Sequence, residues 1–138
     1  GHFLNMVRGL ERLSDATAIA LDSDQPEAMI IPDTYHMFLA GTGPNALGRL
    51  RGDFIAIFQF ADAGKDVEPI LHKGVDSQRV LPGDGKIDLK AYLTNLKKTG
   101  FAGCVSLELY NPEYRKREPV AFLEEALRKT VKVVASVD

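Results

Sequence analysis

Residues 54–60 read FIAIFQF, and this stretch decides the fold class. Every side chain in it except Gln59 is apolar, which is typical of a strand in a parallel sheet whose two faces are both covered. Two further runs have the same character, AMII at 28–31 and CVSLEL at 104–109. We therefore expect three parallel strands at the centre of an α/β fold.

Helical patterns separate these runs. Apolar residues recur at three- and four-residue steps, and Asp88 and Pro119 are suitable residues for starting a helix. The predicted helices cover residues 3–23, 46–50, 88–98 and 119–134. Alternating helices and strands predict right-handed crossovers between parallel strands. The chain contains no repeat or linker, so we expect one domain over residues 1–138. We also expect a long loop at 62–86, and a loop of this length is usually functional or disordered.

Composition excludes several classes of protein. The chain has 138 residues and a formal net charge of −2, which argues against a polycationic nucleic-acid binder. Its single cysteine cannot form an intrachain disulfide or a four-cysteine zinc site. No apolar run approaches the ~18–20 residues of a membrane span, and the first residues do not resemble a signal peptide. We expect a cytoplasmic protein without nucleic-acid or membrane partners.

Polar side chains gather at the predicted carboxyl ends of the three strands. Asp33 and His36 follow the first strand, Gln59 and Asp62 end the second, and Glu108 lies in the third. Ligands of parallel α/β sheets bind at this edge. Carboxylate, amide oxygen and imidazole together suit Mg²⁺, Mn²⁺ or Zn²⁺ better than a soft metal.

Each of these residues also has a plain structural interpretation. Asp33 is equally well placed to cap a turn, and Gln59 to form a hydrogen bond inside the core. Arg79 is either a clamp for an anion or hydroxyl, or a solvated arginine of the loop. Glu108 is harder to explain structurally, because carboxylates in buried strands are rare unless they are paired or bind a metal.

Four motifs occur in an order that resembles a known superfamily. They are DTYH at 33–36, FQFAD at 58–62, RVLPGDG at 79–85 and GCVSLEL at 103–109. In this order and spacing they resemble the sugar phosphate isomerase/epimerase superfamily, whose members are xylose isomerase-like (β/α)₈ TIM barrels. The similarity runs from about residue 10 to 134 and matches the last three strands of such a barrel.

The resemblance implies roles for five residues. Asp33, Gln59 and Glu108 correspond to metal ligands, although many members carry histidine where this chain has Gln59. Bacterial dehydroshikimate dehydratases are members with glutamine at that position. Glu108 would also act as acid and base. His36 would be a second catalytic residue in contact with substrate, and Arg79 would bind substrate. The implied reaction is a metal-dependent proton transfer next to a carbonyl of a small sugar or hydroxy-ketone.

The chain is too short for a complete barrel, and this leaves several functions open. A complete barrel needs ~250 residues, so 138 residues correspond to a partial barrel. The first metal glutamate of the family, at the end of the fifth strand, has no counterpart here. The open sheet edges predict either a homo-oligomer or a missing N-terminal half. The alternatives to an isomerase are a non-catalytic binding or assembly module and a lyase of the dehydroshikimate dehydratase type. A DNA-repair endonuclease is the weakest alternative, because that chemistry uses many histidines.

Overall fold

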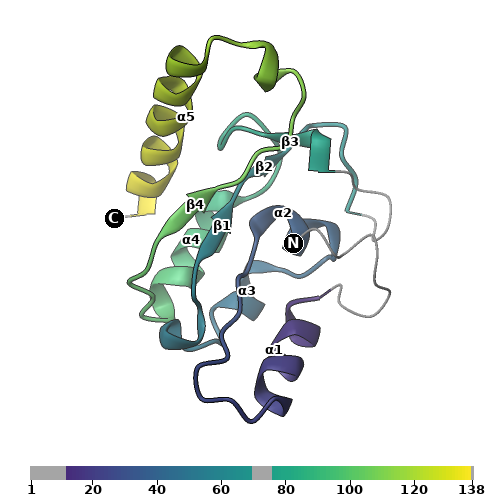
Figure 1. Ribbon diagram of the computed structural model, residues 1–138, viewed down its shortest axis with the longest axis vertical. Helices are drawn as coiled ribbons and strands as arrows, with labels where there is room; N and C mark the ends of the chain where they lie inside the picture. The colour runs from purple at the N-terminus through teal and green to yellow at the C-terminus, as the bar shows by residue number, and fades with distance from the viewer. Residues whose placement is uncertain (1–11, 70–75, 138) are drawn as a thin grey trace.

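A parallel sheet lies at the centre of the molecule, as the computed structural model shows for residues 12–69 and 76–137 (Figure 1). Strand β1 (Phe58–Phe60) pairs in parallel with β4 (Val105–Leu107), with Gln59 opposite Ser106. The extended segment of Ile30 and Asp33 lies along the other side of β1, through parallel bridges to Ile55 and Gln59. The prediction of three parallel segments is therefore confirmed, although the first is a pair of bridges and not a continuous strand.

β1 and β4 are shorter than the apolar runs 54–60 and 104–109 that predicted them. β1 begins at Phe58, and residue 54, where the predicted strand began, belongs to a 3₁₀ turn over residues 52–54. Gly52 donates its N–H to the carbonyl of Thr99 at 2.8 Å, and a Cβ at Gly52 would overlap the backbone of Phe101. This close approach leaves no room for a side chain at residue 52, so it requires a glycine.

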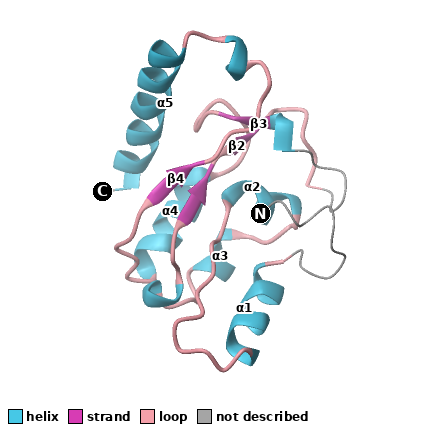
Figure 2. Ribbon diagram, viewed as in Figure 1, coloured by secondary structure: helices cyan, strands magenta, loops and turns pink. Residues whose placement is uncertain are grey.

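The described part of the chain forms five α-helices, which Figure 2 shows together with the sheet. They are α1 (Leu13–Asp22), α2 (Thr34–Leu39), α3 (Pro44–Leu47), α4 (Leu89–Lys98) and α5 (Pro119–Val134). The predictions for α4 and α5 are confirmed, with Asp88 accepting the N–H of Ala91 and Pro119 in the first turn of α5. The predicted helix at 46–50 instead occupies residues 44–47. The beginning of the predicted helix 3–23 lies outside the described residues.

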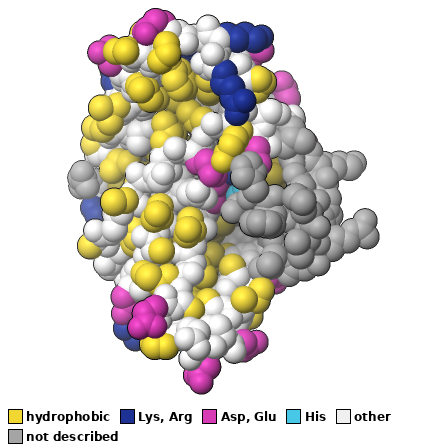
Figure 3. Space-filling view, in the orientation of Figure 1, with side chains coloured by type: hydrophobic (Ala, Val, Ile, Leu, Met, Phe, Trp, Pro, Cys, Tyr) yellow, Lys and Arg dark blue, Asp and Glu magenta, His cyan; other side chains and the backbone are white. Residues whose placement is uncertain are grey.

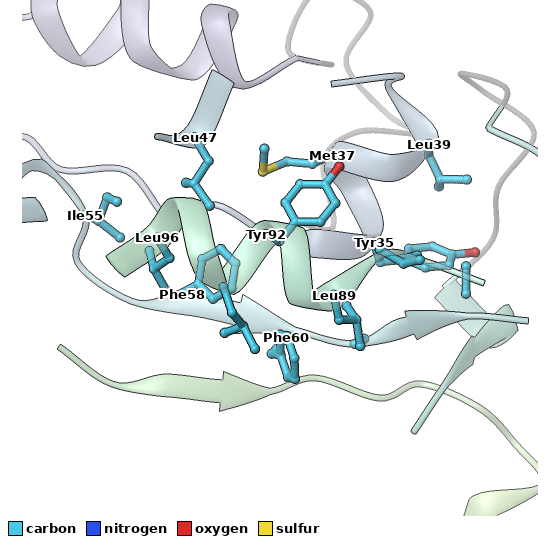
Figure 4. Close-up of a cluster of buried hydrophobic side chains, with 14 of the residues drawn as sticks. Tyr35, Met37, Leu39, Leu47, Ile55, Phe58, Phe60, Leu89, Tyr92 and Leu96 are labelled. Atoms are coloured by element: carbon cyan, nitrogen blue, oxygen red, sulfur yellow. The ribbon is translucent and has the colours of Figure 1, made fainter. Parts of the chain in front are cut away.

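The core lies between the sheet and the helices on its outer face. Phe58 and Phe60 are fully buried in one cluster with Tyr92 and Leu96 of α4, and the Tyr92 ring extends toward Met37 (Figure 4). The Tyr92 hydroxyl donates to the carbonyl of Thr42 at 2.6 Å, so its polar end is satisfied. Because alternate residues of a strand point to opposite faces, burial of the two phenylalanines turns Gln59 to the inner face.

The prediction of a long loop at 62–86 is wrong. The segment contains β2 (Asp62–Ala63) and β3 (Arg79–Val80), which pair antiparallel, with Ala63 opposite Arg79. The carboxylate of Asp62 is buried and accepts backbone N–H groups from Ala63, Gly83, Gly85 and Ile87 at 2.8–3.1 Å. Asp62 therefore organises the turn after β3 and does not join the site at the sheet edge. His72, in the same segment, lies outside the described residues.

The sheet does not close into a barrel within the described residues. β4 pairs only with β1 there, and the fold is a partial α/β barrel with two open edges. No helix in the described ranges is long and apolar enough to cross a membrane.

Candidate functional site

Asp33 stands at the end of the first extended segment, where α2 begins. Its carboxylate Oδ1 accepts the N–H of Tyr35 at 2.7 Å and that of His36 at 3.2 Å, so it is the N-cap of α2. The capping interpretation is thus correct, and it coexists with a place in the site. The cap fixes the carboxylate at the sheet edge, where its side chain is only 3% exposed.

Arg79 lies at the centre of the site, fully buried. Its Nη1 donates to Asp33 Oδ2 at 2.9 Å, and its Nη2 lies 3.2 Å from Asp76 Oδ1 and 3.3 Å from Glu108 Oε2. The guanidinium also stacks 4.7 Å above the ring centre of Tyr35. The interpretation of Arg79 as a solvated loop arginine is therefore wrong. β3 carries it inward, and its guanidinium ties three carboxylates together.

Gln59 and Glu108 come from the two paired strands. Ser106 is the register partner of Gln59, and Glu108, two residues further on, points to the same face. The N–H of Glu108 donates to the carbonyl of Phe60 at 3.1 Å, which continues the ladder beyond β4. Gln59 Nε2 then donates to Glu108 Oε1 at 2.9 Å. The Gln59 amide thus forms its hydrogen bond with another candidate site residue at the sheet edge, and not with a group inside the hydrophobic core.

His36 completes the cluster from the first turn of α2. Arg79 Nη2 lies 3.0 Å from His36 Nε2. Arginine can only donate, so Nε2 must accept, and the imidazole is neutral with its proton on Nδ1. Burial lowers the pKa of His36, with Arg79 adding to this effect, while Asp33 and Asp76 oppose it. His36 therefore acts in this arrangement as a neutral hydrogen-bonding group.

The two principal carboxylates have pKa values displaced in opposite directions. Burial alone would raise the pKa of Asp33, but Arg79, His36 and the capping N–H groups outweigh it and hold that pKa below its usual value. Burial and a hydrogen-bonding interaction with Asp33 raise the pKa of Glu108, against the opposing charge of Arg79. Paired groups displaced in this way are typical of acid–base sites.

Sequence reasoning missed Asp76 and misplaced the residues after β4. Asp76 lies three residues before Arg79 and accepts hydrogen bonds from its guanidinium. The polar sequence around Asp76 has no helical or strand periodicity, so it gave no reason to expect this contact. Asn111, which follows Glu108 after β4, donates its Nδ2 to the carbonyl of Arg79 at 3.1 Å. Glu113 is exposed and pairs with Lys116 at 2.6 Å, outside the site.

The donor set fits a divalent cation in part. Three carboxylates face one guanidinium, which leaves a formal charge of −2 in the cluster. Asp33, Glu108 and the amide oxygen of Gln59 offer the hard oxygen ligands that Mg²⁺ or Mn²⁺ prefers. Within residues 12–69 and 76–137, however, no three His, Cys, Asp or Glu side chains are placed to hold a metal ion. The described residues therefore place hard oxygen donors at one edge of the sheet without bringing three such acidic, His or Cys side chains together around one point.

Comparison with known proteins shows which proteins this chain is similar to. The inosose isomerase of Bacillus licheniformis is 33% identical over 122 residues, which are 88% of this chain and 43% of that relative. The 3-dehydroshikimate dehydratase of Pseudomonas putida is 33% identical over 97 residues, 67% of this chain and 14% of that relative. A crystal structure of IolI protein with a bound zinc atom superposes with a TM-score of 0.85 at 30% identity. It covers 94% of this chain and 45% of the solved one.

The chain spans less than half the length of these relatives. The family model described as xylose isomerase-like TIM barrel matches residues 1–130. That match covers nearly the whole chain, and the parallel sheet, the outer helices and the superposition agree with it. The chain therefore belongs to the xylose isomerase-like TIM barrel family.

Proposed function

We propose that this chain carries the C-terminal part of a divalent-metal-dependent isomerase or epimerase site for a small sugar or hydroxy-ketone. The observation that carries the proposal is the cluster of Asp33, Gln59 and Glu108 around Arg79 at one edge of the sheet. The family and the inosose isomerase relatives support an isomerase-class enzyme. In Halalkalibacterium halodurans, such a relative is 42% identical over 106 residues.

The chain's own groups suit a proton transfer next to a carbonyl. Glu108, whose pKa is raised, is the group proposed to remove a proton from the substrate carbon and return it to the neighbouring carbon or the opposite face. A divalent cation held by Asp33, Gln59 and Glu108 would supply positive charge toward the developing oxyanion. His36 and Arg79 are proposed to orient the substrate oxygens.

Metal binding is the first test of this proposal. Titration with Mn²⁺, followed by electron paramagnetic resonance or calorimetry, should show saturable binding that Asp33→Asn and Glu108→Gln each weaken at least about tenfold. Glu113→Gln is the matched control, because Glu113 is an exposed carboxylate on the loop after the same strand. Equal Mn²⁺ affinity in all four proteins would refute the metal site.

Proton exchange is the second test. An isomerase or epimerase that removes the proton next to a carbonyl should incorporate deuterium from D₂O into a hydroxy-ketone such as inosose, which nuclear magnetic resonance detects. Glu108→Gln should abolish the exchange. A protein that binds Mn²⁺ but exchanges no proton would support the alternative of a non-catalytic binding module.

Gln59 favours one second candidate, a lyase. Relatives in two Pseudomonas species are 3-dehydroshikimate dehydratases, and Gln59 matches the glutamine expected for that class. Such a lyase would remove a proton and a hydroxide as water and leave a new double bond next to a carbonyl. Incubation with 3-dehydroshikimate would then raise ultraviolet absorbance, whereas an isomerase would leave it unchanged.

A further inference from the structure

The guanidinium of Arg79 contacts carboxylates through all three of its nitrogens. Nη1 donates to both oxygens of Asp33, at 3.2 and 2.9 Å. Nε and Nη2 donate to Asp76 Oδ1 at 3.3 and 3.2 Å, and Nη2 also lies 3.3 Å from Glu108 Oε2. Because the Arg79 side chain is 0% exposed, water does not share these contacts. Arg79 is therefore a buried cation that holds three carboxylates at once.

Two of these carboxylates are the proposed metal ligands, and Arg79 contacts an oxygen of each. Asp33 Oδ1 accepts two backbone N–H groups of α2 as well as the Arg79 N–H, so its lone pairs are already in use. Its other oxygen, Oδ2, lies 2.9 Å from Nη1. In Glu108, Oε1 accepts the Nε2 of Gln59 and Oε2 faces Arg79. The guanidinium therefore occupies lone pairs that a divalent cation would need.

Charge limits how a second cation can enter the cluster. Three carboxylates against one guanidinium leave a formal charge of −2, which attracts a divalent cation. A cation bound to Asp33 and Glu108 would nevertheless stand next to the guanidinium, because Arg79 already contacts both. Like charges repel strongly in a site with little water, where the effective dielectric constant is low. Metal binding therefore requires Arg79 to withdraw from at least one of the two ligands.

The cluster meets solvent through its carboxylates and not through its arginine. Asp76 and Glu108 are 22% and 21% exposed, whereas Arg79 is fully buried. Figure 3 shows acidic side chains beside a histidine near the middle of one face of the molecule. Asp76 begins the 3₁₀ turn Asp76–Gln78, three residues before Arg79, so this ion pair does not depend on the sheet edge. A guanidinium that withdraws from the sheet edge thus keeps a carboxylate partner.

We infer that Arg79 is a built-in competitor of the metal ion, which lowers the affinity of Asp33 and Glu108 for a divalent cation and withdraws toward Asp76 when one binds. The inference rests on the proposed function, because it takes Asp33 and Glu108 as metal ligands. It adds a regulation of that site, in which the guanidinium and the metal ion are alternative counter-charges for the same carboxylates. Arg79 therefore makes metal binding weaker and more readily reversible than the carboxylates alone would.

Calorimetric titration of the chain with Mn²⁺ tests the inference. Arg79→Met removes the competing charge, and Arg79→Gln removes it while keeping an N–H donor, so each should lower the Kd for Mn²⁺ at least about tenfold. Arg79→Lys keeps a positive charge, and its Kd should stay within about threefold of that of the unchanged chain. Arg51→Met is the matched control, because Arg51 belongs to an exposed ion pair with Asp53, and its Kd should not change.

A double-mutant cycle tests the role of Asp76. Asp76→Asn alone should raise the Kd for Mn²⁺ about tenfold, because the guanidinium loses the partner toward which it withdraws. In the Arg79→Gln background, the same substitution should change the Kd by less than about threefold. An equal rise in both backgrounds would show that Asp76 acts only through its own charge, and would overturn its part in the inference.

Urea denaturation with and without Mn²⁺ provides a second measurement that is independent of activity. Because a ligand stabilises the folded state more as its Kd falls, one fixed Mn²⁺ concentration should raise the midpoint of Arg79→Gln more than that of the unchanged chain. Saturable Mn²⁺ binding by the unchanged chain, with equal or weaker binding by Arg79→Met and Arg79→Gln, would overturn the inference and leave the proposed metal site in place. No Mn²⁺ binding by any of these proteins would overturn both.

Discussion

Replacement of Arg79 by methionine tests how the buried cluster is held together. The Arg79 side chain is 0% exposed, and Asp33, its partner at 2.9 Å, is 3% exposed. Methionine fills much of the same volume but leaves the Asp33 carboxylate without its cation. Removal of one partner from a buried ion pair costs about 3–5 kcal/mol, because the remaining charge is neither solvated nor neutralised.

The loss of the contacts with Asp76 and Glu108 adds little to this cost in stability. Asp76 and Glu108 are 22% and 21% exposed, so water can solvate them when the guanidinium is removed. We therefore expect Arg79→Met to lower the free energy of unfolding by about 3–5 kcal/mol at pH 7. A domain of this size is stable by about 5–15 kcal/mol, so the variant should fold with reduced stability.

Urea denaturation followed by circular dichroism measures the effect. With an m-value of about 1–3 kcal/mol/M, the midpoint should fall by roughly 2 M. The loss should shrink at acid pH, where protonation of Asp33 removes the unpaired charge. Arg51→Met is the matched control, because Arg51 and its partner Asp53 are 83% and 65% exposed, and its midpoint should not move. A loss below about 1 kcal/mol in Arg79→Met, or one independent of pH, would refute the reasoning.

Three further predictions concern single residues. Asp62→Ala should lower the free energy of unfolding by at least about 3 kcal/mol in urea titrations, because four backbone N–H groups lose their acceptor; a loss within experimental error would contradict this. Gly85→Ala should destabilise the same turn, since a Cβ there would overlap the Ala63 carbonyl; an unchanged thermal midpoint would show that the turn can shift. Burial holds the pKa of His36 below 6.5, so the folded state takes up a proton less readily than the unfolded state. The free energy of unfolding should therefore fall as the pH drops through 6.5 toward the lowered pKa. Urea midpoints measured between pH 5 and 8 should show this fall, and His36→Gln should flatten it.

Local patterns were enough to predict the helices that begin with a clear cap. α4 and α5 were expected at their observed positions because Asp88 and Pro119 satisfy helix starts through contacts within a few residues. The same holds for the place of Gln59 and Glu108 near the carboxyl ends of two neighbouring strands. The gathering of polar side chains at one edge of the sheet was also predictable, because the carboxyl ends of parallel strands meet there.

Local patterns in the sequence therefore encode the three parallel segments, the two long helices α4 and α5, and the place of Asp33, Gln59 and Glu108 at the sheet edge. Helix α2, the antiparallel β2–β3 pair, the burial of Arg79, the contact of Asp76 and the turning away of Asp62 depend on the tertiary fold. The physical reason is distance along the chain. Arg79 meets Asp33 across 46 residues, and Gln59 meets Glu108 across 49. Ion pairs and hydrogen bonds across such separations depend on how the sheet and the β2–β3 pair fold together, and no local periodicity encodes them.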